Sequence, residues 1–185
     1  MKNSHFPTLS KSWDEIKLEM QFARRSDLPW RNARNFKPAY FAGDDVLEVA
    51  NNATNMYLAE NAIFSRTAYG SLGQYENEVV DMMLALLNAP KGAGGNVSTG
   101  GTESIIMCVK TAREWARDNR PTEGPPEIII PHTAHPAFDK AGHMLSVTIR
   151  RMSESLNWRA DPKAMADAVR VNTIMIGGSA PPYPY

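Results

Sequence analysis

The sequence has a single cysteine, Cys108, and one thiol cannot form a disulfide bond within the chain. It has no excess of either charge, because 20 basic and 20 acidic residues cancel. This balance gives no electrostatic reason to expect binding to nucleic acid or to an anionic membrane. The sequence also lacks apolar runs of about 18 residues, the length that spans a membrane, and its first residues lack the apolar stretch of a signal peptide. These absences favour a cytoplasmic protein.

The composition is that of an ordinary globular protein, with 43% hydrophobic and 22% charged residues among 185. A chain of this length has room for one domain with a sizeable core. Cys108 falls within an apolar helical pattern, so we expect its thiol to pack in that core rather than to react.

The most informative segment is a loop of glycine and hydroxyl residues, 94–104, that leads into a predicted helix over 102–119. Gly100 and Gly101 carry no Cβ, so the backbone can turn sharply and approach a ligand closely. The first N–H groups of a helix have no partner within the helix, and the Thr102 hydroxyl adds another donor. Together with the helix dipole, these groups predict a site for a phosphate. The alternative is a plain turn in which Thr102 only caps the helix.

Helices and strands are predicted to alternate after this loop. Short apolar runs predict strands over 127–130, 145–150 and 173–177. The first of these runs has three consecutive isoleucines after Glu127, as in a strand covered on both faces. We predict a short helix over 134–141 and another that begins at Pro162, capped by Asp161. The alternation predicts an α/β fold with a mainly parallel sheet.

The first ninety residues are predicted to be helical. Ser12 and Glu15 have the spacing of a capping box and begin a helix that extends to about residue 25. A second helix is predicted over 44–60 with Asp44 as its cap, and an amphipathic third helix over 73–89. We therefore expect a helical N-terminal arm over 1–90, followed by an α/β segment over 91–185.

Three sequence blocks occur in order: Asn96-Val-Ser-Thr-Gly-Gly-Thr-Glu-Ser-Ile, Pro131-His-Thr-Ala-His-Pro-Ala-Phe-Asp-Lys-Ala and Gly178-Ser-Ala-Pro-Pro-Tyr-Pro-Tyr. In order and spacing they resemble the sphingosine-1-phosphate lyase family, and more broadly the group II decarboxylases that use pyridoxal 5'-phosphate (PLP). The resemblance extends over about residues 65–185. It implies the fold type I architecture of PLP-dependent transferases, with 91–185 as the N-terminal part of the PLP-binding large domain.

The resemblance also implies roles for residues of these blocks. The PLP phosphate would be held by Gly100, Gly101 and Thr102. His135 would stack its imidazole on the pyridine ring, and Ser179 would lie close to the cofactor. Members of the family are homodimers whose active sites receive residues from both subunits, and we expect the segments with Tyr40 and Tyr69 to reach the partner's site.

Covalent PLP catalysis also requires a Schiff-base lysine, and usually an acidic residue paired with the pyridine nitrogen. In the family both come after the block that contains Ser179, as an aspartate and then a His-Lys pair. None of the lysines of this sequence lies in that motif, and Lys140 falls on the helix predicted around His135. The resemblance therefore implies the N-terminal part of a longer enzyme, inactive on its own.

The function implied by the resemblance is that of a PLP-dependent carbon–carbon lyase. Such a lyase cleaves a phosphorylated long-chain base by a retro-aldol reaction, giving an aldehyde and phosphoethanolamine. Two alternatives stay open. One is a fragment of a PLP-dependent amino-acid decarboxylase, and the other is a non-catalytic short subunit that complements a chain carrying the lysine.

Two further patterns predict less specific roles. His132, His135, His143 and Cys108 match no common zinc-binding spacing, so no metal site is predicted. The isolated pair Arg150-Arg151 is interpreted as part of a solvated surface.

Overall fold

In the computed structural model, the described residues are 8–29, 31, 41–64, 67–120, 123–155 and 157–180. The chain separates into two compact units, residues 1–74 and 75–185. The division at residues 90 and 91 that the sequence suggests stays a prediction.

The first unit is helical over most of its described residues. It contains α1 (Trp13–Ala23), the 3-10 helix η1 (Arg24–Ser26), α2 (Asp44–Tyr57), the 3-10 helix η3 (Ala62–Phe64) and the start of α3 (Gly70–Leu86). No residue of α1 or α2 is buried. Apolar side chains of these two helices therefore contribute little to a core within the described residues.

Capping patterns in the sequence predict the first residues of α1 and α2, and the structure confirms the prediction only for α1. The capping box of α1 is confirmed, because the Ser12 hydroxyl accepts the Glu15 N–H at 3.3 Å and the Glu15 carboxylate accepts the Ser12 N–H at 2.8 Å. The predicted cap of α2 is wrong. Asp44 is the first helical residue, and Gly43, with φ of +125°, precedes it without a side-chain capping bond.

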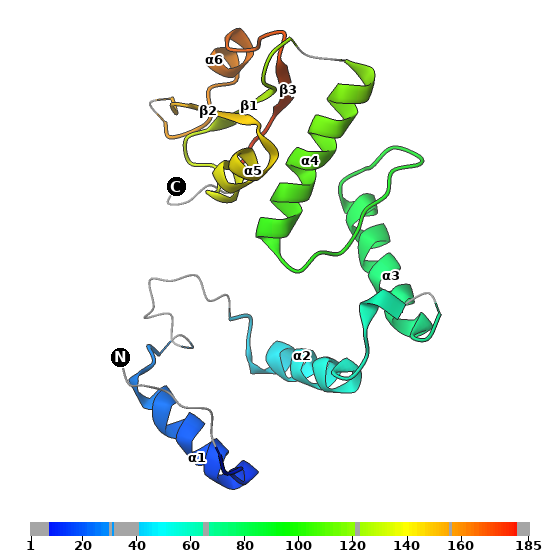
Figure 1. The fold of residues 1–185 in the computed structure, drawn as a ribbon, viewed down its shortest axis with the longest axis vertical. Helices are drawn as coiled ribbons and strands as arrows, with labels where there is room; N and C mark the ends of the chain where they lie inside the picture. The colour runs from blue at the N-terminus through cyan, green and yellow to red at the C-terminus, as the bar shows by residue number, and fades with distance from the viewer. Residues whose placement is uncertain are drawn as a thin grey trace. The chain divides into compact units, whose positions relative to one another are not determined.

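The second unit alternates helices and strands, as predicted (Figure 1). After the rest of α3 its elements are α4 (Gly101–Asn119), β1 (Glu127–Pro131), α5 (Ala137–Leu145), β2 (Thr148–Met152), α6 (Pro162–Asp167) and β3 (Thr173–Ile176). The three strands form one sheet in the order β2-β1-β3, and both pairings are parallel. The prediction of an α/β fold with a parallel sheet is confirmed.

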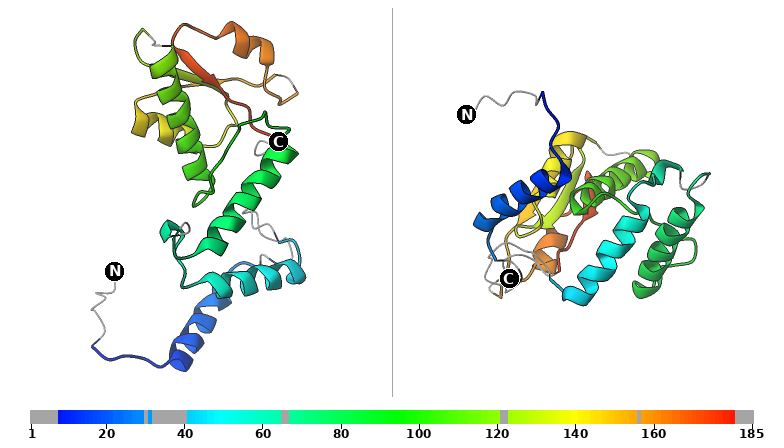
Figure 2. Two further views of the ribbon diagram at one scale, coloured as in Figure 1. Left: turned by 90° about the vertical axis from the view of Figure 1, so that its right-hand side faces the viewer. Right: turned by 90° about the horizontal axis from the view of Figure 1, so that it is seen from below.

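The core of the second unit is built on β1, every residue of which is buried. Ile128 and Ile130 contact Val109 of α4 and Ala141 of α5 in one apolar cluster. Ile129 points the other way and packs with residues of α6. The left view of Figure 2 shows the resulting layers, with α4 and α5 on one face of the sheet and α6 on the other. The three consecutive isoleucines of β1 are thus explained by a sheet covered on both faces.

The second strand and the helix before it differ from the sequence prediction. Leu145 was predicted to begin a strand, but it is the last residue of α5. Ser146 follows in the left-handed conformation with φ of 55°, and the Val147 N–H returns to the Gly142 carbonyl at 3.0 Å. The strand therefore begins only at Thr148. The alternation of apolar residues from Leu145 onward begins within the helix and continues into the strand.

The packing of α4 corrects one expectation about Cys108. Val109 and Ala116 are the buried residues of this helix, whereas Cys108 is exposed. The thiol therefore lies beside the buried stripe and not within it. Among the described residues, no helix combines the length and the apolar character needed to cross a membrane.

Candidate functional site

The direction of α4 brings its first residues to a particular edge of the sheet. The Arg120 guanidinium, just after the helix, donates to the carbonyl of Thr173, the first residue of β3, at 2.6 Å. Cys108, nearer the start of the helix, lies beside Met175 further along β3, with 3.9 Å between their sulfur atoms. α4 therefore runs antiparallel to the strands, and Gly101 lies toward their carboxyl ends. Open parallel sheets bind ligands at this edge.

The start of α4 has the features expected of an anion site. Gly100 is the N-cap residue, with φ of +150° and no side-chain cap. Within the part of the chain that the structure describes, the N–H groups of Gly101, Thr102 and Glu103 have no acceptor. A Cβ built on Gly100 or Gly101 would meet nothing within 4 Å, so the backbone is open on the side where a side chain would be. Three free amides at the positive end of a helix fit a phosphate dianion.

Hydrogen bonds within the loop determine which hydroxyl groups can still donate to a phosphate. The Ser98 hydroxyl donates to the Gly100 carbonyl at 3.1 Å and lies 2.6 Å from the Ser104 hydroxyl. Either hydroxyl of this pair can be the donor, and their contact engages both of them within the loop. The Thr102 hydroxyl has no partner among the described residues, so it remains able to donate to a phosphate.

Glu103 keeps its carboxylate away from the free amides. Its Oε2 atom accepts the backbone N–H of Thr99 at 2.7 Å and the Thr99 hydroxyl at 2.5 Å. The hydrogen bond from the hydroxyl, and next the one from the backbone, hold the pKa of Glu103 below its usual range. The carboxylate is thus ionised and bound to the loop, while the amides of the first helical turn stay open.

His135 lies in the loop between β1 and α5, two residues before the helix begins. The sequence predicted it within a helix over 134–141, so this boundary is corrected. The Ala137 N–H donates to its Nδ1 atom at 3.1 Å. A nitrogen that accepts a hydrogen bond carries no proton, so the neutral imidazole carries its proton on Nε2. This bond fixes the orientation of the ring at the carboxyl end of β1.

The third predicted segment follows β3. The Gly177 N–H donates to the Ile129 carbonyl at 2.9 Å, which extends the ladder past the last residue of β3. Ser179 comes two residues later and is partly buried. Because β1 and β3 are parallel neighbours, Ser179 and His135 follow strands that end at the same edge. The predicted roles of both residues, and of Gly100, Gly101 and Thr102, stay predictions.

The two tyrosines expected to reach a partner's site lie elsewhere in the chain. Tyr40 lies outside the described residues. Tyr69 lies in the first unit, immediately before α3, where its carbonyl accepts the Leu72 N–H at 3.1 Å. Their role toward a second subunit stays a prediction.

The role of Arg151 differs from what the sequence predicts. This residue was interpreted with Arg150 as part of a solvated surface, but both side chains are partly buried and hydrogen-bonded to backbone carbonyls. Arg151 bonds the loop that carries His135, and Arg150 bonds the Ala168 carbonyl on the opposite face. The alternation of strand side chains was the signal that could have separated them. Arg151 and Ile149 are two residues apart on β2, so their side chains lie on the same face of the sheet. Ile149 packs on that face against the core cluster, which includes residues of α5.

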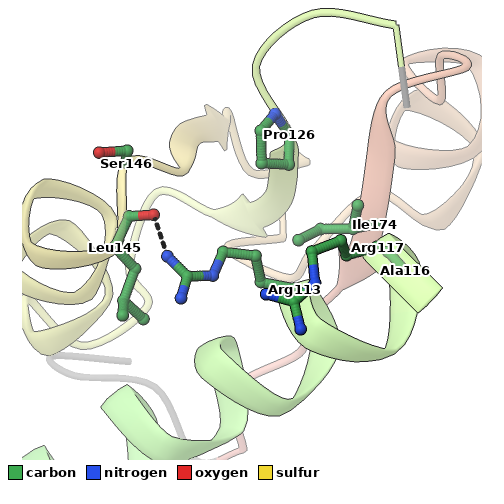
Figure 3. Close-up of a pocket in the computed structure, with 7 residues that line it drawn as sticks. All are labelled: Arg113, Ala116, Arg117, Pro126, Leu145, Ser146 and Ile174. Atoms are coloured by element: carbon green, nitrogen blue, oxygen red, sulfur yellow. Dashed lines mark hydrogen bonds between the residues drawn. The ribbon is translucent and has the colours of Figure 1, made fainter. Parts of the chain in front are cut away.

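A pocket of about 480 Å³ lies at the opposite edge of the sheet (Figure 3). It is lined by Pro126, which precedes β1, and by Ile174 near the start of β3, together with Arg113 and Arg117 of α4. Both arginines pair with the Glu114 carboxylate, and Arg113 also donates to the Leu145 carbonyl at 2.8 Å. The cationic groups are therefore occupied, and the free amides lie at the other end of α4. We assign the candidate site by these amides and not by cavity size.

The imidazoles and the thiol considered for zinc form no such site here. Across the described ranges, no three His, Cys, Asp or Glu side chains come close enough together to hold one metal ion.

Comparison with known proteins identifies the family. No family model matches the chain. A sphingosine-1-phosphate lyase of Oryza sativa subsp. japonica is 32% identical over an alignment of 190 positions, which covers 98% of this chain and 34% of that protein. A solved sphingosine-1-phosphate lyase structure from Burkholderia pseudomallei, also 32% identical, aligns with a TM-score of 0.88 over 98% of this chain and 43% of that one. The chain belongs to the sphingosine-1-phosphate lyase family.

The match to this lyase family confirms the resemblance and the fold type I architecture predicted from the sequence. The chain spans about 34% of the length of the rice lyase, and it therefore corresponds to part of that protein. A probable L-tyrosine/L-aspartate decarboxylase of Methanosarcina acetivorans is 33% identical over 138 residues, covering 65% of this chain and 35% of that protein. The wider decarboxylase family named in the sequence prediction is thus also represented among the relatives.

Proposed function

We propose that this chain forms the phosphate-binding and ring-stacking part of a PLP-dependent lyase. The observation that carries the proposal is the open start of α4, where three backbone N–H groups have no acceptor among the described residues. Gly100, Gly101 and Thr102 would hold the phosphate of the cofactor. His135 would lie against its ring, and Ser179 would lie nearby at the same edge of the sheet.

The residues of the chain supply binding and orientation. PLP, when bound, acts as an electron sink for cleavage of a bond next to the substrate's amine-bearing carbon. The amides of the first turn of α4 hold a dianion without a buried lysine or arginine, because the helix dipole contributes the positive potential. The His135 ring is held by the Ala137 N–H at Nδ1, which leaves the Nε2 proton free to point toward a ligand.

For the reaction we propose retro-aldol cleavage of a phosphorylated long-chain base to an aldehyde and phosphoethanolamine. Coverage supports this choice: the rice lyase aligns with 98% of the chain, whereas the decarboxylase of M. acetivorans aligns with 65%. Amino-acid decarboxylation is the second candidate, supported by the 33% identity to that decarboxylase. The two reactions share the same cofactor site and differ in the bond that is broken.

We propose that the 185 residues alone do not turn over substrate, because none of the lysines fits the role of Schiff-base residue. Lys140 comes nearest in sequence to His135, but it is an exposed residue of α5. The lysine and the acidic partner of the pyridine nitrogen would come from residues other than these, in the same polypeptide or in a complementing one. A short non-catalytic subunit remains the alternative.

A homodimer in the cytoplasm is the expected state of the active protein. For the homodimer, though not for the location, support comes from an apolar groove of about 310 Å³ in the second unit, between α3 and the segment with Gly95 and Val97. Val79, Met83 and Leu87 line it and are each about half exposed or more. Light scattering of the purified protein tests this expectation, and a monomer at all concentrations would contradict it.

Titration of the purified protein with PLP, followed by absorbance and by induced circular dichroism, tests the cofactor site. We expect Thr102→Val to weaken PLP binding by about tenfold, because one hydrogen bond to a charged group is lost. Thr111→Val is the matched control, since Thr111 lies on the same helix and its hydroxyl donates to the Met107 carbonyl, away from the start of the helix. Equal loss in both variants, or no PLP binding at all, would contradict the proposed site.

The choice of reaction is tested by the products. Incubation of a PLP-loaded longer polypeptide, in which these residues are joined to the part that carries the lysine, with a phosphorylated long-chain base should release an aldehyde and phosphoethanolamine. Release of carbon dioxide from an amino acid, without cleavage of the phosphorylated base, would support the decarboxylase instead. If the protein binds PLP and gives neither product until a second chain with the lysine is added, the complementing-subunit alternative is correct.

A further inference from the structure

The Arg151 guanidinium on β2 connects two segments on either side of His135. Its Nε and Nη2 atoms bond the two carboxylate oxygens of Asp139 on α5, at 3.2 and 2.6 Å. Its Nη1 atom donates to the carbonyls of His132 at 2.6 Å and Ala134 at 2.9 Å. One side chain therefore holds the loop immediately before His135 and the helix immediately after it.

The same loop is also held by packing, because Ala134 is buried in the core cluster with Ile128 and Ile130, and by two hydrogen bonds of its backbone N–H groups. The His132 N–H donates to the Met152 carbonyl at 2.7 Å, and the Thr133 N–H donates to the Glu154 carboxylate at 3.0 Å. These bonds hold the backbone N–H groups of His132 and Thr133 against the end of β2 and against Glu154, just beyond it. Its carbonyls at His132 and Ala134 depend on Arg151.

We propose that Arg151 is a positioning residue for His135. By holding the carbonyls before His135 and the carboxylate of Asp139 after it, Arg151 fixes the backbone that places the imidazole at the carboxyl end of β1. This inference rests on the proposed function for its consequence, which is that the imidazole lies flat against the PLP ring. The arrangement of the loop itself does not depend on a cofactor.

The chemistry of arginine suits this position. The guanidinium is planar and presents donors in two directions, so it can bond a carboxylate in bidentate fashion and backbone carbonyls at the same time. Its side chain is only 21% exposed, which limits competition from water. A lysine would keep the charge, but its single ammonium group could not reproduce both sets of bonds.

Hydrogen exchange without cofactor tests the first half of the proposal. In Arg151→Gln, we expect exchange in a peptide covering 133–138 to be about tenfold faster, because the bonds that hold this loop are lost. Arg150→Gln is the matched control: it makes the same substitution on the same strand, and Arg150 bonds the Ala168 carbonyl on the other face. Unchanged exchange in Arg151→Gln, or an equal increase in Arg150→Gln, would overturn the proposal.

The cofactor spectrum tests the second half. In Arg151→Gln we expect the induced circular dichroism per bound PLP to fall and the PLP dissociation constant to rise about tenfold, through loss of preorganisation. Arg151→Lys should recover only part of the induced circular dichroism and only part of the affinity for PLP. Faster exchange with an unchanged spectrum and affinity would overturn the assignment of Arg151 to His135. Absence of PLP binding by the unaltered protein would instead overturn the proposed function, and the exchange result would still decide whether Arg151 orders the loop.

A second variant covers the case in which Arg151→Gln does not fold. Asp139→Asn keeps the bonds from Arg151 to the carbonyls and removes the charged anchor of the guanidinium. We expect it to fold, because Asp139 is about half exposed, and to give a smaller rise in exchange over 133–138. Exchange equal to that of the unaltered protein in a folded Asp139→Asn, together with an unchanged PLP spectrum, would count against the proposal.

Discussion

Glu103 accepts two hydrogen bonds from Thr99, one from the backbone N–H at 2.7 Å and one from the hydroxyl at 2.5 Å. Thr99 precedes the N-cap residue Gly100, and Glu103 is the third residue of α4. The pair therefore resembles a capping box displaced by one residue, in which the carboxylate returns to the loop and not to the cap. Its effect is to brace the loop while the amides of the first helical turn stay open to a ligand.

This pair predicts a local change on removal of the carboxylate. In Glu103→Ala we expect the Thr99 amide to exchange with solvent about tenfold faster, because its acceptor is lost. Glu114→Ala is the control, since Glu114 lies on the same helix but pairs with Arg113 and Arg117. Hydrogen exchange of the loop peptide measures the difference. An unaltered Thr99 amide in Glu103→Ala would contradict the bracing role.

The same pair predicts a pH dependence. Hydrogen bonds from Thr99, with the hydroxyl as the larger cause, hold the pKa of Glu103 below its usual 4.5. A depressed pKa stabilises the loop at pH values above the usual one, and this contribution is lost as the pH falls through the depressed value. The loop should therefore keep its order at pH values above the usual 4.5 and lose this contribution only as the pH falls through the depressed pKa, which hydrogen exchange of the loop peptide at a series of pH values measures.

Removal of the Thr99 hydroxyl tests the cause of that shift. In Thr99→Val, the pKa of Glu103 should rise toward 4.5, because only the backbone N–H remains as donor. An NMR titration of the Glu103 side chain measures this, with Thr111→Val as the control on the same helix. If the pKa of Glu103 is the same in both variants, the hydroxyl is not the main cause.

The helices and strands of the second unit could be predicted where one local pattern dominates. The uninterrupted apolar run of β1 identified a strand covered on both faces, and Asp161 with Pro162 identified the start of α6, where Asp161 accepts the Ala164 N–H at 3.0 Å. The start of β2 could not be predicted in this way. Leu145, the last residue of α5, continues the alternation of apolar residues into the strand, and only the left-handed turn at Ser146 separates the two elements.

The residues of the candidate site also differ in whether their contacts are local in sequence. Gly100, Gly101 and Thr102 were predicted because the chemistry of a helix N-terminus is local in sequence. The role of Arg151 was missed, because its partners lie 12 to 19 residues away at Asp139 and His132. Only the parallel register of β1 with β2, which pairs Pro131 with Met152, brings Arg151 to the end of β1.

The two glycines before the phosphate site predict opposite effects of the same substitution. Gly100 has φ of +150° and ψ of 173°, a region that is essentially restricted to glycine, so Gly100→Ala should cost about 1–3 kcal/mol. Gly101 is the first helical residue, and Gly101→Ala should be neutral or stabilise by up to about 1 kcal/mol. Neither added Cβ meets an atom within 4 Å, so the comparison isolates the backbone conformation. Urea unfolding measures both, and equal stability of the two variants would contradict the strain at Gly100.

The contact between α5 and β2 predicts a large effect at Gly142. A Cβ there would lie 2.5 Å from Cγ1 of Ile149 and 2.7 Å from the Val147 carbonyl oxygen. The side chain of Ile149 can move, but the carbonyl belongs to the backbone of the turn, so α5 must shift away from the strand. We expect Gly142→Ala to lower the free energy of unfolding by about 1–3 kcal/mol, whereas Gly70→Ala, a helical glycine with nothing within 4 Å, should not.

A double variant distinguishes the two obstacles at Gly142. If Ile149 alone opposed the Cβ, then Gly142→Ala would cost nothing further in a protein that already carries Ile149→Ala. Because the Val147 carbonyl remains at 2.7 Å, most of the cost should persist in the Ile149→Ala background. If Gly142→Ala caused no loss of stability in the Ile149→Ala background, the Val147 carbonyl would be able to move away from the added Cβ.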